Sequence, residues 1–168
     1  MARLVLVLAG FWLGMLVASW LMATANFRAV DRVLGPDARP EIAARLGGVP
    51  AEDRRVVLRH LVGEINRWMF GRWALAQLAL GGIVLAAAWR LPGWPRLLAA
   101  AALLLVVVQL AFLTPAIESA GRSIDFVPRP LPPDVGRRFG TLHAAYVGAD
   151  FAKAILVAGA AWIVARRP

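Results

Sequence analysis

Four residues at the start of the last apolar stretch, or just before it, carry polar chemistry into what is otherwise a hydrophobic segment. They are His143, Tyr146, Asp150 and Lys153, at positions i, i+3, i+7 and i+10. This spacing places all four along one face of an α-helix, with less than one turn between Asp150 and Lys153. An ion at the centre of a membrane helix costs about 2.5–3.5 kcal/mol. We therefore expect these two charges to pair with each other.

A second polar stripe lies at the end of the third apolar stretch. Thr114, Glu118 and Arg122 recur there at four-residue intervals, and glutamate four residues before arginine is the favourable order for a helical ion pair. Pro115 removes one backbone hydrogen bond, so we expect a kink that turns carbonyl oxygens toward the polar residues. The predicted ligand-binding or polar cluster is Glu118, Arg122, Asp125, His143, Tyr146, Asp150 and Lys153.

Two interpretations of this cluster stay open. It is either an ion-pair network that fixes helix packing or a hydrated pocket that binds a ligand, ion or proton. Both interpretations place Glu118, Arg122 and His143 within reach of the Asp150–Lys153 pair on neighbouring helices. Four polar residues of the second span and its approach enter from the same side, namely Asn66, Arg67, Arg72 and Gln77.

The sequence lacks motifs for metal, haem or covalent catalysis. It has no cysteine, and its two histidines, His60 and His143, belong to no HExxH motif or His pair on one helix. No serine lies in a nucleophile elbow. We predict no enzymatic activity, no metal and no cofactor. A haem or copper site built from His60 and His143 with Met69 is the alternative.

Four apolar stretches position these residues, and each is long enough to cross a bilayer. They cover residues 4–25, 68–89, 97–117 and 146–164, and about 20 helical residues span a hydrocarbon core of about 30 Å. Hydrophobic residues make up 60% of the chain, more than the share of about 45–50% in soluble domains. A signal peptide is the alternative for the first stretch, but signal-peptide apolar regions are shorter, about 7–15 residues.

We predict an all-α membrane protein, one domain over residues 1–168, with four transmembrane helices in a bundle and an amphipathic helical segment between the first and second. That polar segment covers residues 27–67. Proline followed by acidic residues predicts helix starts at 40 and 50. A helix over residues 51–89 would be about 58 Å long. The helix either projects from the bilayer as a straight extension or bends near Gly63 or Gly71 and lies along the membrane surface, and we expect the bend. In a further interpretation its apolar stripe packs on the chain's own polar loop.

The connections after the second span differ in character. Residues 90–96 contain proline and glycine and predict a tight turn between two antiparallel helices, whereas the proline-rich residues 128–133 predict an extended segment. Both termini and the 90–96 turn fall on one side of the membrane. Their basic residues, without an acid among them, are Arg3, Arg90, Arg96, Arg166 and Arg167.

The distribution of arginine bears on orientation and partners. We place the arginine-rich side with both termini in the cytoplasm of a bacterial inner membrane, although a count over the long loops favours the opposite orientation. The formal net charge of +9 suits anchoring at lipid headgroups, and no soluble basic domain is available for nucleic acid. The expected partners are membrane lipid and other membrane subunits or a second copy of the chain.

The C-terminal polar residues also carry a resemblance. Leu142-His143-x-x-Tyr146 with Asp150 and Lys153, behind Thr114-Pro115 and the stretch from Gly121-Arg122 to Asp125-Phe126, resembles an uncharacterised family of small four-helix bacterial membrane proteins. That family is related to transmembrane protein 205 and, distantly, to the copper-resistance protein D-like domain. The resemblance covers about residues 66–160. It implies a multi-pass fold without established enzymatic activity, and a link to copper only by analogy.

These observations predict a small multi-pass membrane protein that acts as a ligand-binding, accessory or scaffold subunit. The first alternative is a proton-coupled or small-solute transporter in which Glu118, Asp150 and Lys153 titrate. The second is a haem- or copper-binding subunit of a membrane redox complex. Transport requires a water-accessible path to both faces of the membrane, whereas a binding protein needs access from one side only.

Overall fold

The protein folds into a bundle of long helices. A computed structural model describes residues 1–36, 38–127 and 130–167, and these residues form helices and no strand. The elements are α1 (Ala2–Leu34), α2 (Pro40–Leu46), α3 (Ala51–Trp89), α4 (Trp94–Val108), the π-helix η1 (Gln109–Leu113), α5 (Thr114–Arg122) and α6 (Pro133–Ala165). Of these elements, α4, η1 and α5 follow one another without a break and form one helical segment, Trp94–Arg122.

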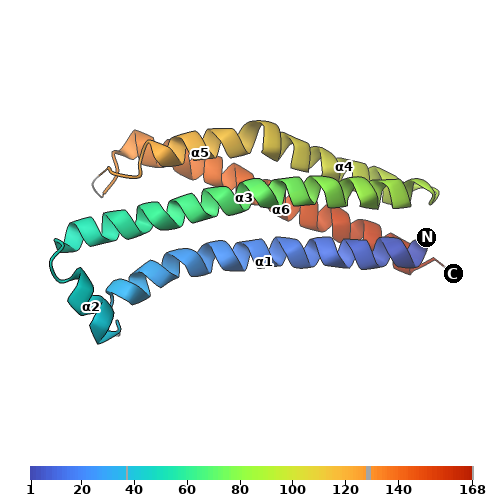
Figure 1. The fold of residues 1–168 in the computed structure, drawn as a ribbon. Coiled ribbons are helices and arrows are strands. Elements are labelled where there is room, and N and C mark those ends of the chain that lie inside the picture. The colour runs from blue at the N-terminus through green and yellow to red at the C-terminus, as the bar shows by residue number, and fades with distance from the viewer. Residues whose placement is uncertain (37, 128–129, 168) are drawn as a thin grey trace.

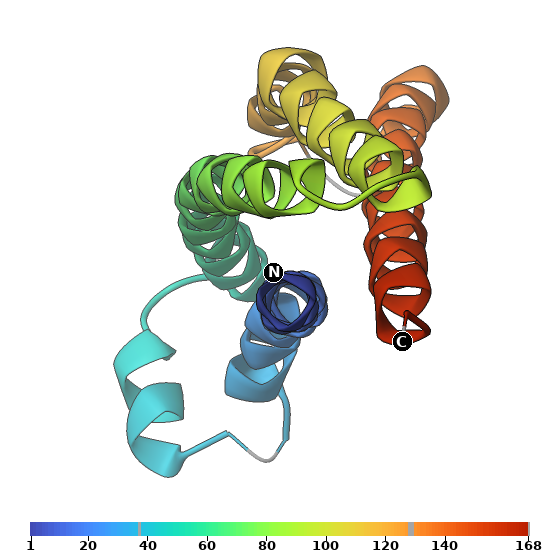
Figure 2. The same ribbon diagram turned by 90° about the vertical axis from the view of Figure 1, so that its right-hand side faces the viewer.

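The long helices alternate in direction around a square. α1 packs on α3 and α6, and α4 packs on the same two helices, so each long helix has two neighbours. Both termini lie at one end of the bundle, beside the turn that joins α3 to α4 (Figure 1, Figure 2). We call the half of the bundle at this end the terminal half and the other half, which contains α2 and α5, the distal half.

Length and composition identify four membrane spans. The four helical segments Ala2–Leu34, Ala51–Trp89, Trp94–Arg122 and Pro133–Ala165 are long and apolar enough to cross a bilayer. The predicted fold, an all-α membrane protein with four spans and a helical segment between the first two, is confirmed. The helices extend well beyond the predicted apolar stretches, because polar residues at the distal end continue them.

α3 does not bend where a bend was expected. It runs unbroken through Gly63 and Gly71 over 39 residues, and Figure 1 shows it as one continuous helix. A glycine inside a helix costs only about 1 kcal/mol, and polar contacts with α1 hold the extension in place. Asn26 Nδ2 donates to Asn66 Oδ1 at 2.7 Å, and Arg55 pairs with Asp31 at 2.9 Å.

The apolar stripe of this α3 extension is only partly covered. Val57, Leu61 and Ile65 are 58%, 54% and 47% exposed, whereas Leu58 and Val62 are half-buried and Met69 is 7% exposed. α2, which lies within the polar loop, has no buried residue. The alternative expectation, that the stripe packs on the polar loop of the chain, therefore finds no support in α2.

The connections near the ends of the helices match their sequences. Gly93 adopts φ +78° in the turn between α3 and α4, a conformation that glycine accepts at little cost. The Arg167 guanidinium donates to the Pro92 carbonyl and ties the C-terminus to this turn. Residues 128 and 129 of the predicted extended segment lie outside the described residues, and α6 begins at Pro133.

The hydrophobic core occupies the terminal half. It is built from small and medium-sized apolar side chains together with Trp12, which is fully buried. Gly81 permits this packing, because a Cβ there would lie 2.8 Å from Trp12 Cη2 and 2.9 Å from Leu103 Cδ1. The other core members are Val5, Ala9, Leu16, Leu80, Val84, Ala87, Ala88, Ala99, Ala102, Val106, Val157 and Val164.

Candidate functional site

A large cavity lies in the distal half between α1, α3, α5 and α6. Its volume is about 1080 Å³, and its lining on α3 extends from Ala51 to Phe70. Those 19 residue steps correspond to about 28 Å along the helix. Most lining side chains are apolar, and six are aromatic: Trp20, Phe27, Phe70, Phe139, Tyr146 and Phe151. The cavity is therefore long, apolar and rich in aromatic rings.

The closed end of the cavity rests on a buried ion pair of α6. Lys153 Nζ lies 2.8 Å from Asp150 Oδ1 and donates to Gln77 Oε1 at 2.9 Å. Lys153 is 0% exposed and Asp150 is 4% exposed. Thirteen residues separate Lys153 from Arg166, about 20 Å along the helix, so the pair lies within a hydrocarbon core of about 30 Å.

Groups from three other helices complete the hydrogen bonding of this pair. Trp12 Nε1 donates to Gln77 Oε1 at 3.2 Å, and Trp20 Nε1 donates to Asp150 Oδ2 at 3.2 Å. Gln109 Nε2 donates both to Asp150 Oδ1 at 3.0 Å and to the Tyr146 carbonyl at 3.1 Å. We call Trp12, Trp20, Gln77, Gln109, Asp150 and Lys153 the polar layer.

The polar layer is a satisfied network. Both Asp150 oxygens and the Lys153 ammonium have partners, which offsets much of the cost of placing charge in a medium that solvates it poorly. The layer joins α1, α3, η1 and α6 at one level of the bundle. It thus separates the apolar core of the terminal half from the cavity of the distal half.

The π-helix contributes to this arrangement. η1 begins at Gln109, and the Thr114 amide donates to the Gln109 carbonyl across a widened turn. Pro115 follows and supplies no N–H, so the backbone absorbs the missing donor in this turn. The widened turn holds Gln109, which is 2% exposed, against α6. A local disturbance near Pro115 was predicted from the sequence, and a π-helix is the form it takes.

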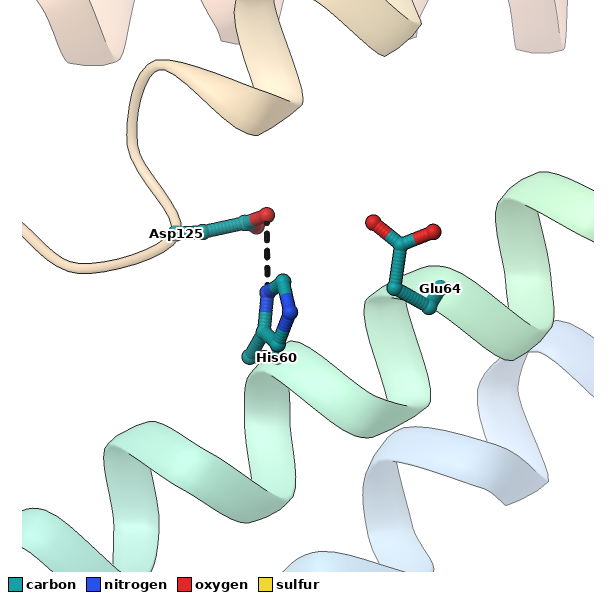
Figure 3. A group of neighbouring side chains, drawn as sticks. All are labelled: His60, Glu64 and Asp125. Carbon is teal, nitrogen blue, oxygen red and sulfur yellow. Dashed lines mark hydrogen bonds and ion pairs between the residues drawn. The ribbon is translucent and has the colours of Figure 1, made fainter.

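A second charged cluster lies at the side of the cavity between α3 and the end of α5. His60 Nδ1 lies 3.0 Å from Asp125 Oδ2, and Glu64 stands one helical turn beyond His60 (Figure 3). Arg67 Nη2 lies 2.7 Å from both Glu64 Oε1 and Asp125 Oδ2, and Arg122 Nη1 lies 2.9 Å from Glu64 Oε1. We call these five residues the arginine cluster.

The arginine cluster has the donor set of a metal site but the charge balance of an ion-pair network. His60, Glu64 and Asp125 each offer one ligand atom, and these three atoms lie within 4.8 Å of one another. Two guanidinium groups already neutralise the two carboxylates, so a divalent cation would have to displace Arg67. Arg67 donates a hydrogen bond to Glu64 and lowers the pKa of that carboxyl below its ordinary value.

The structure divides the seven predicted site residues among different surroundings. Asp150 and Lys153 pair as expected. Arg122 reaches Glu64 and makes no ion pair with Glu118, and Asp125 bonds to Arg67 and His60. The expected reach of Arg122 to the Asp150–Lys153 pair is therefore wrong, because α5 directs its last turn toward α3.

The other predicted residues line the cavity. Glu118, Tyr146 and His143 all do so, and among the described residues Glu118 has no ion-pair partner. The His143 ring stacks on Phe139, with centroids 6.1 Å apart. His60 and His143 thus have separate surroundings, one in the arginine cluster and one against an aromatic ring.

Sequence reasoning missed the contacts of four contributors, one of which, His60, it considered only as a haem or copper ligand. Trp12 and Trp20 supply two donors to the polar layer, and His60 and Glu64 belong to the arginine cluster. A signal for the first two was present: tryptophans eight residues apart share a helix face, and a buried indole N–H requires an acceptor. A signal for the others was the His60–Glu64 spacing of four, which places both on one side of α3.

No known protein family, curated protein or solved structure matches this chain. The features of the molecule that bear on function are the cavity, the polar layer and the arginine cluster.

Proposed function

We propose that this protein is a membrane-embedded binding protein that holds an apolar ligand in the cavity of its distal half. The single observation that carries the proposal is the size and lining of that cavity. Ligand pockets are typically about 300–1,000 Å³, mostly apolar, with a few convergent polar groups. At about 1080 Å³, with six aromatic side chains, this cavity fits that description at the large end.

Access from one side favours binding over transport. The terminal half is filled by the apolar core, in which Trp12, Leu16 and Val84 are at most 2% exposed. The polar layer closes the cavity above that core. A transporter would need a second arrangement of the helices in which the terminal half opens. The packed core of that half gives no support for such an arrangement.

The proposed setting is a bacterial inner membrane with both termini in the cytoplasm. Arginines of the terminal end lie over exposed tryptophans, as expected at headgroup level: Arg166 Cζ is 4.1 Å from the Trp162 ring centroid, and Arg96 Cζ is 5.8 Å from that of Trp89. In this orientation the cavity opens to the outer side. Membrane lipid surrounds the bundle, and a subunit or second copy could cover the apolar stripe of α3. No catalytic role, metal or cofactor is part of the proposal.

Binding can be tested with N-phenyl-1-naphthylamine, a neutral apolar probe whose fluorescence rises in a dry site. The protein in lipid nanodiscs should bind it saturably, above the background of empty nanodiscs. Val147→Trp should weaken that saturable signal, because Val147 lines the cavity and the larger ring would narrow it.

Ile155→Trp is the matched control, since Ile155 lies on the same helix but is 71% exposed on the outer surface. It should leave probe binding unchanged. The proposal fails if the wild-type protein shows no saturable binding, or if both tryptophan variants bind as the wild type does.

A further inference from the structure

The cavity contains one half-buried carboxylate without an ion-pair partner among the described residues. Four acidic residues line it, and two of them pair with cations. Asp150 pairs with Lys153, and Asp125 pairs with Arg67. The third, Glu52, also forms no ion pair among the described residues, but it is exposed, so water solvates its charge. Glu118 has no ion-pair partner among the described residues.

The ion-pair partners of the lining residues do not change the charge balance of the cavity. Arg55 and Arg59 share Asp31, at 2.9 Å and 4.0 Å, so the two arginines with Asp31 and Glu52 are neutral together. The arginine cluster holds two arginines and two carboxylates and is also neutral. The ion pair of the polar layer is neutral as well. One negative charge, that of Glu118, remains inside the cavity.

A second observation points to a ligand at the same place. Thr114 lies one turn before Glu118 on α5 and also lines the cavity. It is 7% exposed, and its Oγ1 is buried without a hydrogen-bond partner. The Tyr146 hydroxyl lies beside it, but no hydrogen bond of ordinary geometry joins them. A buried hydroxyl without a partner is costly, about 1–3 kcal/mol, and a ligand could relieve that cost.

Aromatic rings surround these polar groups. Six of the fifteen aromatic residues of the chain line the cavity, including its single tyrosine. They approach one another in pairs across it: Trp20 and Phe151 are 4.7 Å apart between centroids, and Phe70 and Tyr146 are 5.8 Å apart. The face of an aromatic ring attracts cations, and aromatic cages recognise substituted ammonium groups.

We infer that the ligand of this cavity is a hydrophobic organic cation with a single positive charge, such as a protonated amine on an apolar body. The inference rests on the proposed binding function. Glu118 supplies the opposite charge, the aromatic rings contact the cation and the apolar body, and Thr114 accepts a hydrogen bond from an ammonium N–H. An anionic amphiphile does not suit the site, because each arginine of the lining is already engaged with an acid.

Charge preference can be measured with two ions of nearly identical size and shape. Tetraphenylphosphonium should displace N-phenyl-1-naphthylamine from the protein in nanodiscs of neutral lipid at a concentration at least about tenfold lower than tetraphenylborate does. Both ions are corrected for partitioning into empty nanodiscs. Equal displacement, or a preference for the anion, would overturn the inference.

Glu118→Gln should remove the preference for the cation, whereas probe binding should persist. Glu52→Gln is the matched control, because it also removes one carboxylate from the lining but at the exposed mouth. It should change the preference by less than about twofold. If Glu118→Gln keeps the full preference, Glu118 is not the counter-ion and the inference fails.

The role of Thr114 has its own readout. Thr114→Val should weaken the binding of 4-phenylbutylammonium several-fold and leave tetraphenylphosphonium, which has no N–H, unchanged. No effect on either ion would contradict the assignment of Thr114. Failure of the charge preference with intact, saturable probe binding would remove the cation and leave the binding function; absence of probe binding would remove both.

Discussion

The two halves of the bundle use the same four membrane-spanning segments for opposite purposes. In the terminal half, α6 presents Val157, Ala160 and Val164, each 2% exposed in a packed apolar core. In the distal half the same helix presents Tyr146, Val147 and His143 to an open cavity. The polar layer marks the change from one half to the other. The fold thus closes one end by packing and holds the other end open by ion pairs at its edges.

The packed half and the charged edges supply different kinds of rigidity. Dense apolar packing fixes the helices in the terminal half, where adding or removing one methyl group changes the stability of the protein. In the distal half, bonds between Asp31 and Arg55 and within the arginine cluster join the helices across the cavity. A cavity kept open in this way can accept a ligand without first breaking a core.

The polar layer offers the largest test of this comparison. Lys153→Met leaves the Asp150 carboxylate charged and buried, and Asp150→Asn leaves the Lys153 ammonium charged and buried. Each change alone should lower the free energy of unfolding by about 3–5 kcal/mol. The double variant should recover a large part of that loss. Unfolding in mixed micelles, followed by circular dichroism, measures the cycle.

Asp134 and Arg137 provide an exposed control pair on the same helix, with side chains 93% and 74% exposed. The corresponding changes should cost less than about 1 kcal/mol. Additive losses for Asp150 and Lys153 would show that the two do not interact, and the layer would not separate the halves.

Two adjacent glycines of α3 sharpen the description of the packed half. Gly81→Ala should destabilise the protein by about 1–3 kcal/mol, because its Cβ would meet Trp12 and Leu103. Gly82→Ala should leave stability unchanged or raise it slightly, since nothing lies within 4 Å of a Cβ there. Thermal unfolding of the two variants side by side measures the difference. Equal stabilities would mean that the terminal half is looser than its contacts indicate.

The smallest expected effect concerns the charged edge of the cavity. The lowered pKa of Glu64 means that its bond to Arg67 stabilises the folded state fully above the ordinary value of 4.5. That contribution is lost as the pH falls through the lower folded-state pKa. Glu64→Gln should therefore flatten the pH dependence of stability below about pH 4.5 and nowhere else. An unchanged acid limb would show that Glu64 is not held by Arg67 in the folded protein.

The sequence predicted the fold well because a membrane imposes simple requirements on it. Run length identified all four spans, and the proline and glycine positions identified the start of α2 and the turn at Gly93. The pairing of Asp150 with Lys153 was also predictable, since both lie on one helix at a fixed spacing. Span length depends on the thickness of the bilayer, and the turns and the ion pair depend on residues that are close in sequence.

Contacts between helices were beyond sequence reasoning. Arg122 could reach either Glu118 on its own helix or Glu64 on α3, and the rotation of α5 decided for Glu64. The straight course of α3 depended on contacts with α1, such as Asn26 with Asn66, 40 residues apart. The cavity follows from how far four helices diverge at their distal ends, which no local pattern of residues records.

The cavity is confined to the distal half of the bundle, away from the end that holds the termini (Figure 1). The chain has no cysteine, so single cysteines at Val147, in the cavity, and Val157, in the core of the same helix, can be labelled separately with a membrane-impermeant maleimide. In oriented vesicles the Val147→Cys thiol should react only from the side opposite the termini and be protected by N-phenyl-1-naphthylamine, while the Val157→Cys thiol should react from neither side. Labelling of the Val147→Cys variant from the side of the termini, or of the Val157→Cys variant from either side, would contradict the account.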